Sequence, residues 1–297
     1  MKKLLTVCAF ALLVTLSGCK DATTSLSDGN DALITVGNTK ITKNDVYTGL
    51  KSENGVTAVI SKLTAYIVDQ EVPVTDEMMS EAQETMQSFK DTVGESNWAT
   101  FLANMGYDDE QQYLEERALL SVRAAQLTSK YINENYDQIK ETYQIRKVRI
   151  FQTTDSAIAA EVQEKVQNGE LTIQDAVNQY DAVTTTYDGS EQILTNASGL
   201  GSSIWENIMA VTEDNTVLTP YQYSSDLSNF YVIEVVSVDV PLEEAQSTIE
   251  GLSTISDDAF AYYLKKYNFT VYDIDLYNGI KSQKASYIVQ EDRKSVV

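Results

Sequence analysis

The sequence predicts an α+β protein in which mostly helical N-terminal and C-terminal segments flank a small module of strands and helices. Two observations support this class. Apolar residues recur at helical spacing over residues 42–143 and again over residues 241–267. Between them, strand-like runs at 146–152 and 230–238 enclose two helical stretches and a loop rich in Thr, Ser, Gly and Asn.

Residues 1–18 predict a processing signal that leaves the folded protein. Two lysines precede an uncharged stretch of 13 residues from Leu4 to Leu16. This stretch is too short for a membrane span, which needs roughly 20 apolar residues. A positive start, a short apolar run and small residues before the cut are typical of a secretory signal peptide.

The segment "LSGC", residues 16–19, resembles the bacterial lipobox, in which the cysteine becomes the lipidated first residue. Cys8 lies in the removed piece, so no disulfide is expected. We expect Cys19 to anchor the chain on the extracytoplasmic face of the cell membrane, because two acyl chains bind stably. Residues 19–30 then form a flexible tether. An ordinary signal peptide with an incidental cysteine is the alternative.

Composition excludes several kinds of function. The net charge of −22, from 44 acidic and 22 basic residues, opposes binding to nucleic acid or to anionic lipid. The absence of histidine excludes Ser-His-Asp and Cys-His triads and histidine metal sites. We therefore expect no metal and no cofactor. The acidic excess either keeps the protein soluble or attracts basic unfolded proteins outside the cell, and the sequence leaves both open.

Residues 31–145 predict an N-terminal helical lobe. Two β-type runs around Gly37-Asn38 predict a hairpin, and Thr42 with Asp45 predicts the capping box of a first helix. A second helix is expected over about 56–70, ended by Pro73. After Asp108, helical spacing continues for some 35 residues, which predicts a rod of roughly 50 Å.

A further helix begins at Thr75 and carries one apolar stripe, formed by Met78, Ala82, Met86, Phe89 and Val93. Such a stripe is most often part of a core. Because methionine side chains adapt to varied partners, an adaptable binding groove is the alternative.

Residues 146–240 predict the α+β module. Asp155 is placed to cap a helix that ends near Gly169, and Thr172 with Asp175 predicts the capping box of the next helix. Residues 241–280 predict a helix that starts at Pro241 and then a strand in "NFTVYDIDLY", residues 268–277. Residues 281–297 are expected to be a tail.

The stretch "ALITVGNTKITKNDVYTGL" after a lipobox resembles the start of PrsA-type extracytoplasmic foldases and the chaperone lobe of SurA. In that family the opening reads V-x-V-N-G-x-x-I-T-x-x-x-F. The resemblance covers residues 31–280 through the order of elements. It implies a SurA-like chaperone lobe at 31–145, a parvulin-like prolyl isomerase domain at 146–240, and a segment at 241–280 that packs back on the first lobe.

The resemblance also locates a degenerate parvulin pocket. "KVRIF" resembles V-x-H-I-L with Arg149 at the histidine, "ASGLGSSIW" resembles G-G-D-L-G-W with Gly199 at the aspartate, and "NFYVIEV" resembles G-Y-H-I-I-x-V with Tyr231 at the second histidine. Pro220 and Tyr221 lie near the family's S-x-P-V. Arginine only donates hydrogen bonds and a tyrosine titrates near pH 10, so neither replaces an imidazole that shares a proton. We expect no catalytic residue among them.

The resemblance implies a membrane-anchored foldase or chaperone that binds unfolded or partly folded exported proteins, with weak or no isomerase activity. One alternative is an active parvulin-type prolyl isomerase. A more distant one is a surface binding lipoprotein or solute receptor, although the repeated βα units of such receptors are missing. Whether the protein forms a homodimer is left open.

Overall fold

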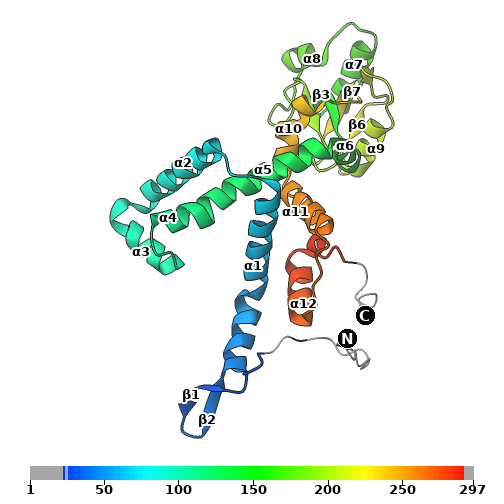
Figure 1. Cartoon of the computed structure of the whole chain (residues 1–297). Coiled ribbons are helices and arrows are strands. Elements are labelled where there is room, and N and C mark those ends of the chain that lie inside the picture. The colour runs from blue at the N-terminus through cyan, green and yellow to red at the C-terminus, as the bar shows by residue number, and fades with distance from the viewer. Residues whose placement is uncertain (1–22, 24–25, 291–297) are drawn as a thin grey trace, which may run out of the picture. The chain divides into compact units, whose positions relative to one another are not determined.

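The computed structural model describes residue 23 and residues 26–290 (Figure 1). The chain divides into two compact units, residues 1–63 with 264–297, and residues 64–263. The predicted signal peptide and the predicted lipidation site Cys19 lie outside the described residues. Within the described ranges, no helix is long and apolar enough to cross a membrane.

The first unit begins with the predicted hairpin. Strand β1 (Ala32–Val36) pairs antiparallel with β2 (Thr39–Thr42), and the turn uses Gly37 at a φ of +58°, which favours glycine. The predicted capping box is present, because the Asp45 carboxylate accepts from the Thr42 backbone N–H at 2.8 Å and Thr42 Oγ1 accepts from the Asp45 N–H at 3.3 Å. One helix, α1 (Lys43–Glu71), replaces the two predicted helices.

Helix α12 (Ile274–Gln283) packs closely on α1 in this unit, and two glycines make the approach possible. A Cβ added to Gly279 would lie 2.6 Å from Val56 Cγ2, and one added to Gly55 would lie 3.0 Å from Leu276 Cδ2. This packing explains why α1 contains a glycine that lowers its intrinsic helix propensity. A 3₁₀ turn, η2 (Ala285–Tyr287), follows α12, so the predicted tail begins inside a helix.

The strand predicted over residues 268–277 is wrong. The carboxylate of Asp273 caps α12 by accepting from the backbone N–H groups of Asp275 and Leu276, at 3.0 and 3.1 Å. The same carboxylate accepts from Lys51 Nζ at 3.1 Å, with both side chains nearly inaccessible to water. The Asp273 cap, which is paired with Lys51 of α1, therefore outweighs the β propensity of Val271 and Tyr272.

The second unit starts with helices, whose core holds the predicted stripe except for Phe89, which is exposed. They are α2 (Asp76–Val93), α3 (Glu95–Met105), α4 (Glu110–Tyr113), the π-helical turn η1 (Leu114–Ala118), α5 (Leu119–Glu134) and α6 (Tyr136–Tyr143). Thr75 caps α2 by accepting from the Met78 N–H. Of the stripe, Ala82 is buried, while Met78 and Met86 are half-buried against the same core.

The long helix predicted after Asp108 is interrupted once. The chain runs helically from α4 through η1 to the end of α5, and then Asn135 takes a φ of −127° and a ψ of 22°. Its side-chain amide donates to the Tyr131 carbonyl at 2.9 Å, and its backbone N–H donates to the same carbonyl at 3.0 Å. The predicted single rod is therefore two helices, α5 and α6.

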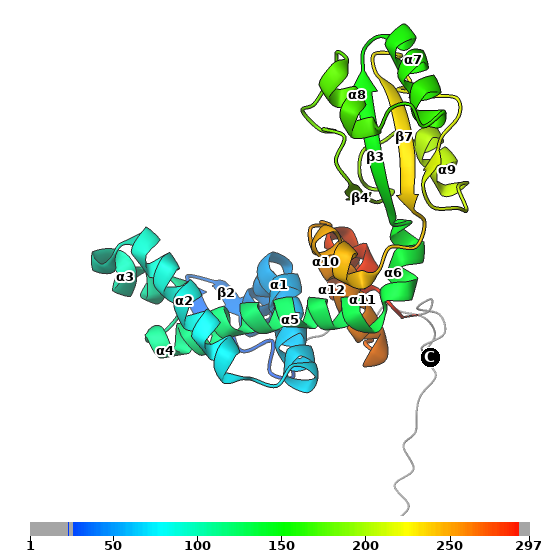
Figure 2. The same cartoon turned by 90° about the horizontal axis from the view of Figure 1, so that it is seen from above.

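The α+β module has an antiparallel sheet at its centre, which confirms the predicted fold class. Its strands are β3 (Arg146–Thr153), β4 (Gln192–Leu194), β5 (Thr216–Val217), β6 (Gln222–Tyr223) and β7 (Phe230–Ser237). The order is β4-β3-β7-β5, and β6 also pairs with β7. Figure 2 shows β3 and β7 running side by side as the long central strands.

Helices cover both faces of this sheet. Helix α7 (Ser156–Gln167) begins at Asp155 and α8 (Ile173–Gln179) at Thr172, as predicted, since each side chain accepts hydrogen bonds from the first turn. Helix α9 (Ser202–Met209) covers the other face. The helix predicted after Pro241 is divided into α10 (Leu242–Glu250) and α11 (Ile255–Lys266) at Gly251.

Candidate functional site

The two faces of the β3–β7 ladder have different neighbours. Side chains alternate along a strand, and residues that pair directly across a ladder point to the same face. Ile150 of β3 pairs with Ile233 of β7, and both belong to the core formed with α9. Phe151 pairs with Val232, and both belong to the core formed with α7 and α8. The site residues that lie on β3 and β7, Arg149 and Tyr231 among them, can each be placed on one of these faces.

Arg149 lies on the α7/α8 side of the sheet. It pairs across the ladder with Glu234, and its guanidinium donates to the Glu234 carboxylate at 2.9 Å and also to Glu191. Burial works against its charge, but the hydrogen bonds and charges of the two glutamates outweigh it and raise the pKa of Arg149. Arg149 is therefore held as a cation in an ion-paired cluster.

Tyr231 lies on the α9 side, opposite to Arg149. Its ring packs edge-on against Tyr187, with ring centroids 6.2 Å apart and planes at 86°. Burial, and to a smaller extent the charge of Asp226, raises the pKa of Tyr231, so the phenol is neutral at physiological pH. Among the described residues its hydroxyl has no hydrogen-bond partner, which leaves it free to bind a ligand.

Gly199 lies in the loop before α9 and has a φ of +82°. A Cβ at this position would meet nothing within 4 Å, so the positive φ, not a lack of space, favours glycine there. Because Arg149 and Tyr231 lie on opposite faces of the sheet, the structure does not bring Arg149, Gly199 and Tyr231 into one pocket. On β3, the two neighbours of Arg149, Val148 and Ile150, both face α9 and are apolar.

A row of polar side chains crosses the α9 face at Tyr231. Gln152 of β3 and Gln222 of β6 both pair directly with Tyr231 of β7, so the three share one face, and we call them the polar row. Gln152 and Gln222 are buried. Gln152 donates to Asn229 Oδ1 at 2.7 Å. Gln222 donates to the Pro220 carbonyl and accepts from Asn207 Nδ2 of α9, both at 2.7 Å.

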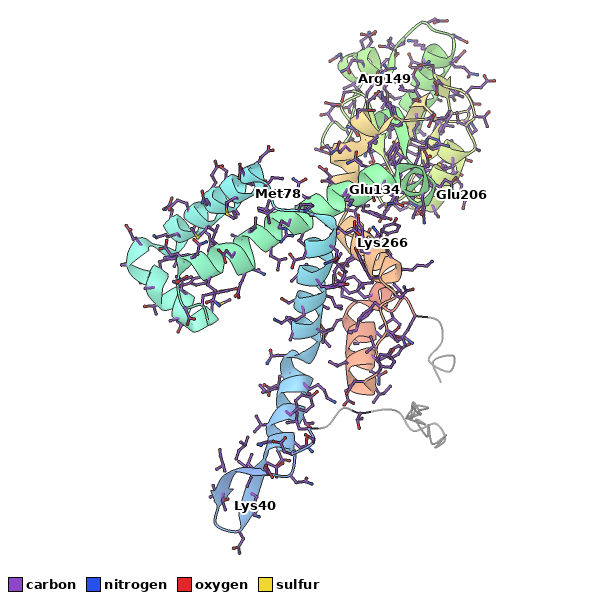
Figure 3. The ribbon with its side chains drawn as sticks, in the orientation of Figure 1. Lys40, Met78, Glu134, Arg149, Glu206 and Lys266 are labelled. Carbon is purple, nitrogen blue, oxygen red and sulfur yellow. The ribbon has the colours of Figure 1, made fainter. Side chains whose placement is uncertain are left out.

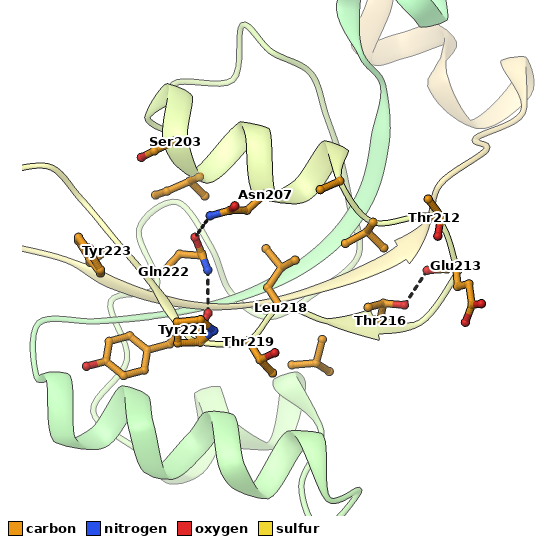
Figure 4. A pocket seen from close by; sticks show the side chains of 15 residues that line it. Ser203, Asn207, Thr212, Glu213, Thr216, Leu218, Thr219, Tyr221, Gln222 and Tyr223 are labelled. Atoms are coloured by element: carbon orange, nitrogen blue, oxygen red, sulfur yellow. Dashed lines mark hydrogen bonds between the residues drawn. The ribbon is translucent and has the colours of Figure 1, made fainter.

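A cavity of about 600 Å³ adjoins the polar row at Gln222 (Figure 4). One side is α9, and the other is the chain from residue 211 to residue 223. The lining residues are Ser203, Ile204, Asn207, Ala210, Val211, Thr212, Glu213, Thr216, Val217, Leu218, Thr219, Pro220, Tyr221, Gln222 and Tyr223. Pro220 and Tyr221, which the sequence places near the parvulin S-x-P-V segment, are among them.

The lining suits a neutral ligand with both donors and acceptors. Glu213 is its one charged residue, while hydroxyl and amide side chains supply groups that donate and accept. Leu218 and Pro220 add apolar surface. A peptide backbone has the same mixture of N–H and C=O groups, and the cavity volume is that of an ordinary ligand pocket. In the part of the chain that the structure describes, no cluster of acidic or cysteine side chains could hold a metal ion.

Sequence reasoning missed Gln152, Asn207 and Gln222. Gln152 follows Arg149 by three residues and could have been found by following the strand alternation. Gln222 belongs to a two-residue strand, and its partner Asn207 comes from a helix 15 residues earlier. No spacing in the sequence predicts the contact between Gln222 and Asn207, because it depends on the path that residues 211–223 take along α9.

No protein-family model matches the chain, and no curated protein matches its sequence. Solved structures do resemble it. A peptidylprolyl isomerase PrsA from Bacillus cereus is 20% identical, with a TM-score of 0.47, and the match covers 86% of this chain and 98% of that one. The foldase protein PrsA from Streptococcus pneumoniae is 15% identical, with a TM-score of 0.38, over 87% of this chain and 100% of that one.

Proposed function

We propose that the protein is a lipid-anchored extracytoplasmic foldase that binds unfolded exported proteins and has weak or no prolyl isomerase activity. The observation that carries this proposal is the cavity between α9 and residues 211–223, whose lining is mostly uncharged, with the polar row beside it. Its groups complement a peptide backbone without requiring a charged or defined side chain. A chaperone needs such a surface, since its clients share a backbone and little else.

The same face argues against rapid isomerisation. Rotating a peptide bond crosses a barrier of roughly 18–20 kcal/mol, and an isomerase must bind the twisted amide better than the planar one. The central residues facing α9 are Ile150, Gln152 and Tyr231, none of which exchanges a proton near neutral pH. The alternative, an active parvulin-type isomerase, would have to work without such a group.

Aggregation of an unfolded exported protein in the presence of the mature chain, residues 19–297, tests the binding part. Ala210→Trp should fill the cavity and weaken protection, because Ala210 lines it. Glu206→Trp is the matched control, since Glu206 is exposed on the same helix and does not line the cavity. Equal protection by both variants would contradict the cavity as the client site.

The anchor has its own test. Cys19→Ser should release the protein from the membrane fraction and abolish incorporation of a labelled fatty acid, because the thiol is the predicted attachment point. Retention of Cys19→Ser in the membrane would remove lipidation from the proposal and leave the peptide site unaffected.

We also include a homodimer, for which the β1–β2 hairpin is the candidate contact. A two-stranded hairpin is at best marginally stable alone, and here Ile34 and Val36 are 52% and 68% exposed. A second copy could cover them through a two-fold interface. Light scattering should give twice the chain mass for the mature protein and the single mass for Ile34→Ser/Val36→Ser. A monomer in both would exclude this contact.

A further inference from the structure

The helical part of the second unit exposes apolar side chains that continue directly into its core. We call α2, α3, α4 and η1 the α2–η1 lobe, residues 76–118. Four of the six methionines of the chain, Met78, Met79, Met86 and Met105, belong to it. The first three are half-buried against the core, while Met105 is 59% exposed. Figure 3 labels Met78 on α2.

Aromatic rings connect this surface to the interior of the lobe. Phe89 is 39% exposed and lies 5.3 Å from Phe101 and 6.1 Å from Trp98 between ring centroids. Trp98 is buried and stacks on Phe101 at 5.2 Å, and Tyr113 packs edge-on against Trp98 at the same distance. An apolar group placed on Phe89 would therefore extend an existing aromatic cluster.

The lobe also contains a buried donor without an acceptor. Trp98 Nε1 has no hydrogen-bond partner among the described residues, although Trp98 is only 3% exposed. Buried donors are nearly always satisfied, because an unpaired one costs the free energy of its lost hydration. The adjacent π-helical turn η1, Leu114–Ala118, belongs to the same cluster, and such turns are often found at functional sites.

Charge decides what kind of partner fits. Residues 75–118 contain 11 acidic and 2 basic side chains, a formal charge of −9. One of the two cations, Lys90, already pairs with Glu110 at 2.6 Å. A second copy of the lobe and an anionic membrane would both be repelled. A segment with positive side chains between apolar ones would be attracted at its charges and buried at its apolar groups.

We propose that the α2–η1 lobe binds cationic, apolar-containing segments of unfolded polypeptide chains. Apolar side chains of the segment lie on Phe89, Met105 and the half-buried methionines, whose flexible thioethers adapt to different sequences. The lysines and arginines of the bound segment lie against the acidic side chains of the lobe. This inference rests on the proposed chaperone function and names the class of client segment that the protein prefers.

Fluorescence anisotropy of two dye-labelled peptides of about 15 residues tests the inference with the mature chain. One peptide alternates lysine with leucine, and the other has glutamate at the lysine positions. We expect the lysine peptide to bind at least about tenfold more tightly at low salt, with the difference shrinking as salt rises toward about 0.5 M. Equal binding of both peptides would overturn the proposal.

Variants locate the site. Phe89→Ser/Met105→Ser should weaken the lysine peptide about tenfold by removing apolar contact area. Leu227→Ser is the matched control, because Leu227 is as exposed as Met105, at 59%, and lies in a loop of the α+β module. If the double variant does not fold, as judged by circular dichroism, Glu81→Gln/Glu84→Gln on the exposed side of α2 should reduce the preference for lysine instead. Unchanged binding by a folded variant of either kind would contradict the assignment.

Trp98 gives a direct report from inside the lobe. The chain has two tryptophans, so Trp205→Phe leaves Trp98 as the one emitter. Its emission should shift on addition of the lysine peptide and not on addition of the glutamate peptide. Aggregation suppression, measured on the same samples, separates the two proposals: no suppression by the unmodified chain refutes the chaperone function, whereas undiminished suppression by Phe89→Ser/Met105→Ser refutes the lobe alone.

Discussion

The two faces of the β3–β7 ladder share the same strands and differ in what they offer to a ligand. On the α7/α8 side, Phe151 and Val232 are fully buried and Arg149 is engaged by two glutamates. On the α9 side, the polar row runs into a cavity of about 600 Å³, and the Tyr231 hydroxyl has no partner among the described residues. One face is closed by packing and ion pairs, and the other adjoins a cavity.

The difference shows how strongly strand alternation limits a functional assignment. Neighbouring residues of β3 point to opposite faces of the sheet. An error of one position in aligning the sequence therefore assigns a binding role to a residue that faces the ion pairs on the other side. The polar chemistry of the α9 face comes from Gln152, Tyr231 and Gln222, none of which is charged at neutral pH. The predictions that follow test this division, beginning with the largest expected effect.

Phe151→Ala should destabilise the α+β module by about 3–5 kcal/mol, because it leaves a large cavity in a face that is fully packed. Urea denaturation followed by circular dichroism measures the change. Leu227→Ala, at an exposed position, should stay within about 0.5 kcal/mol. A small effect of Phe151→Ala would mean that the α7/α8 face is not the closed one.

Alkaline pH should weaken the α9 face. Burial raises the pKa of Tyr187 and, as the larger cause, that of Tyr231. A raised pKa means that the folded state holds these protons more tightly than the unfolded state. The contribution of the two phenols to the free energy of unfolding is therefore complete below about pH 10 and is lost as the pH rises above it.

The measurement is the urea midpoint at pH 8 and again near pH 11. Tyr187→Phe/Tyr231→Phe should lose less stability over this interval than the unmodified chain, because it lacks the two protons. All other tyrosines titrate equally in both proteins, so the difference between them isolates the α9 face. An identical loss in both would contradict the assignment of two buried phenols to that face.

Arg149→Ala should cost about 1–2 kcal/mol of stability, since it leaves the half-buried Glu234 without a cation. Client protection should not change, because Arg149 lies on the other side of the sheet from the cavity. Lys165→Ala, which removes an exposed pair with Glu161, is the control and should leave stability nearly unchanged. Loss of client protection at unchanged stability would place Arg149 in the binding site after all.

Tyr231→Phe should have the smallest effect on stability, below about 1 kcal/mol, since its hydroxyl makes no bond to a described residue. It should weaken a neutral, proline-containing peptide by a few-fold if the hydroxyl binds the backbone. Calorimetric titration of the peptide into each protein measures this. A several-kcal/mol loss of folding stability would show that the hydroxyl is structural.

Much of the fold could be predicted because local signals agree with tertiary packing. The capping residues Thr42, Thr75, Asp155 and Thr172 each begin a helix where the sequence places it. Errors occur where distant contacts decide. The strand predicted at 268–277 is absent, and α12 begins inside it at Ile274, because Asp273 caps that helix while it is held by Lys51, 222 residues away in the chain.

The candidate site was predicted less well. The resemblance directed attention to the segment containing Pro220 and Tyr221, and this segment lines the cavity. It aligned Arg149 with a pocket position, and the strand register of β3 and β7 puts that residue on the opposite face. Asn207 and Gln222 could not be paired from the sequence, because their hydrogen bond depends on the return of a short strand beneath α9.

The most direct test of the central claim is two-dimensional exchange NMR of a short proline-containing peptide with the mature chain. We predict that the peptide resonances shift on binding while cis–trans exchange keeps its uncatalysed time constant, on the order of tens of seconds at 25 °C. Exchange that becomes much faster with the unmodified chain and returns to the uncatalysed rate with Tyr231→Phe would contradict it, because the α9 face would then catalyse the rotation.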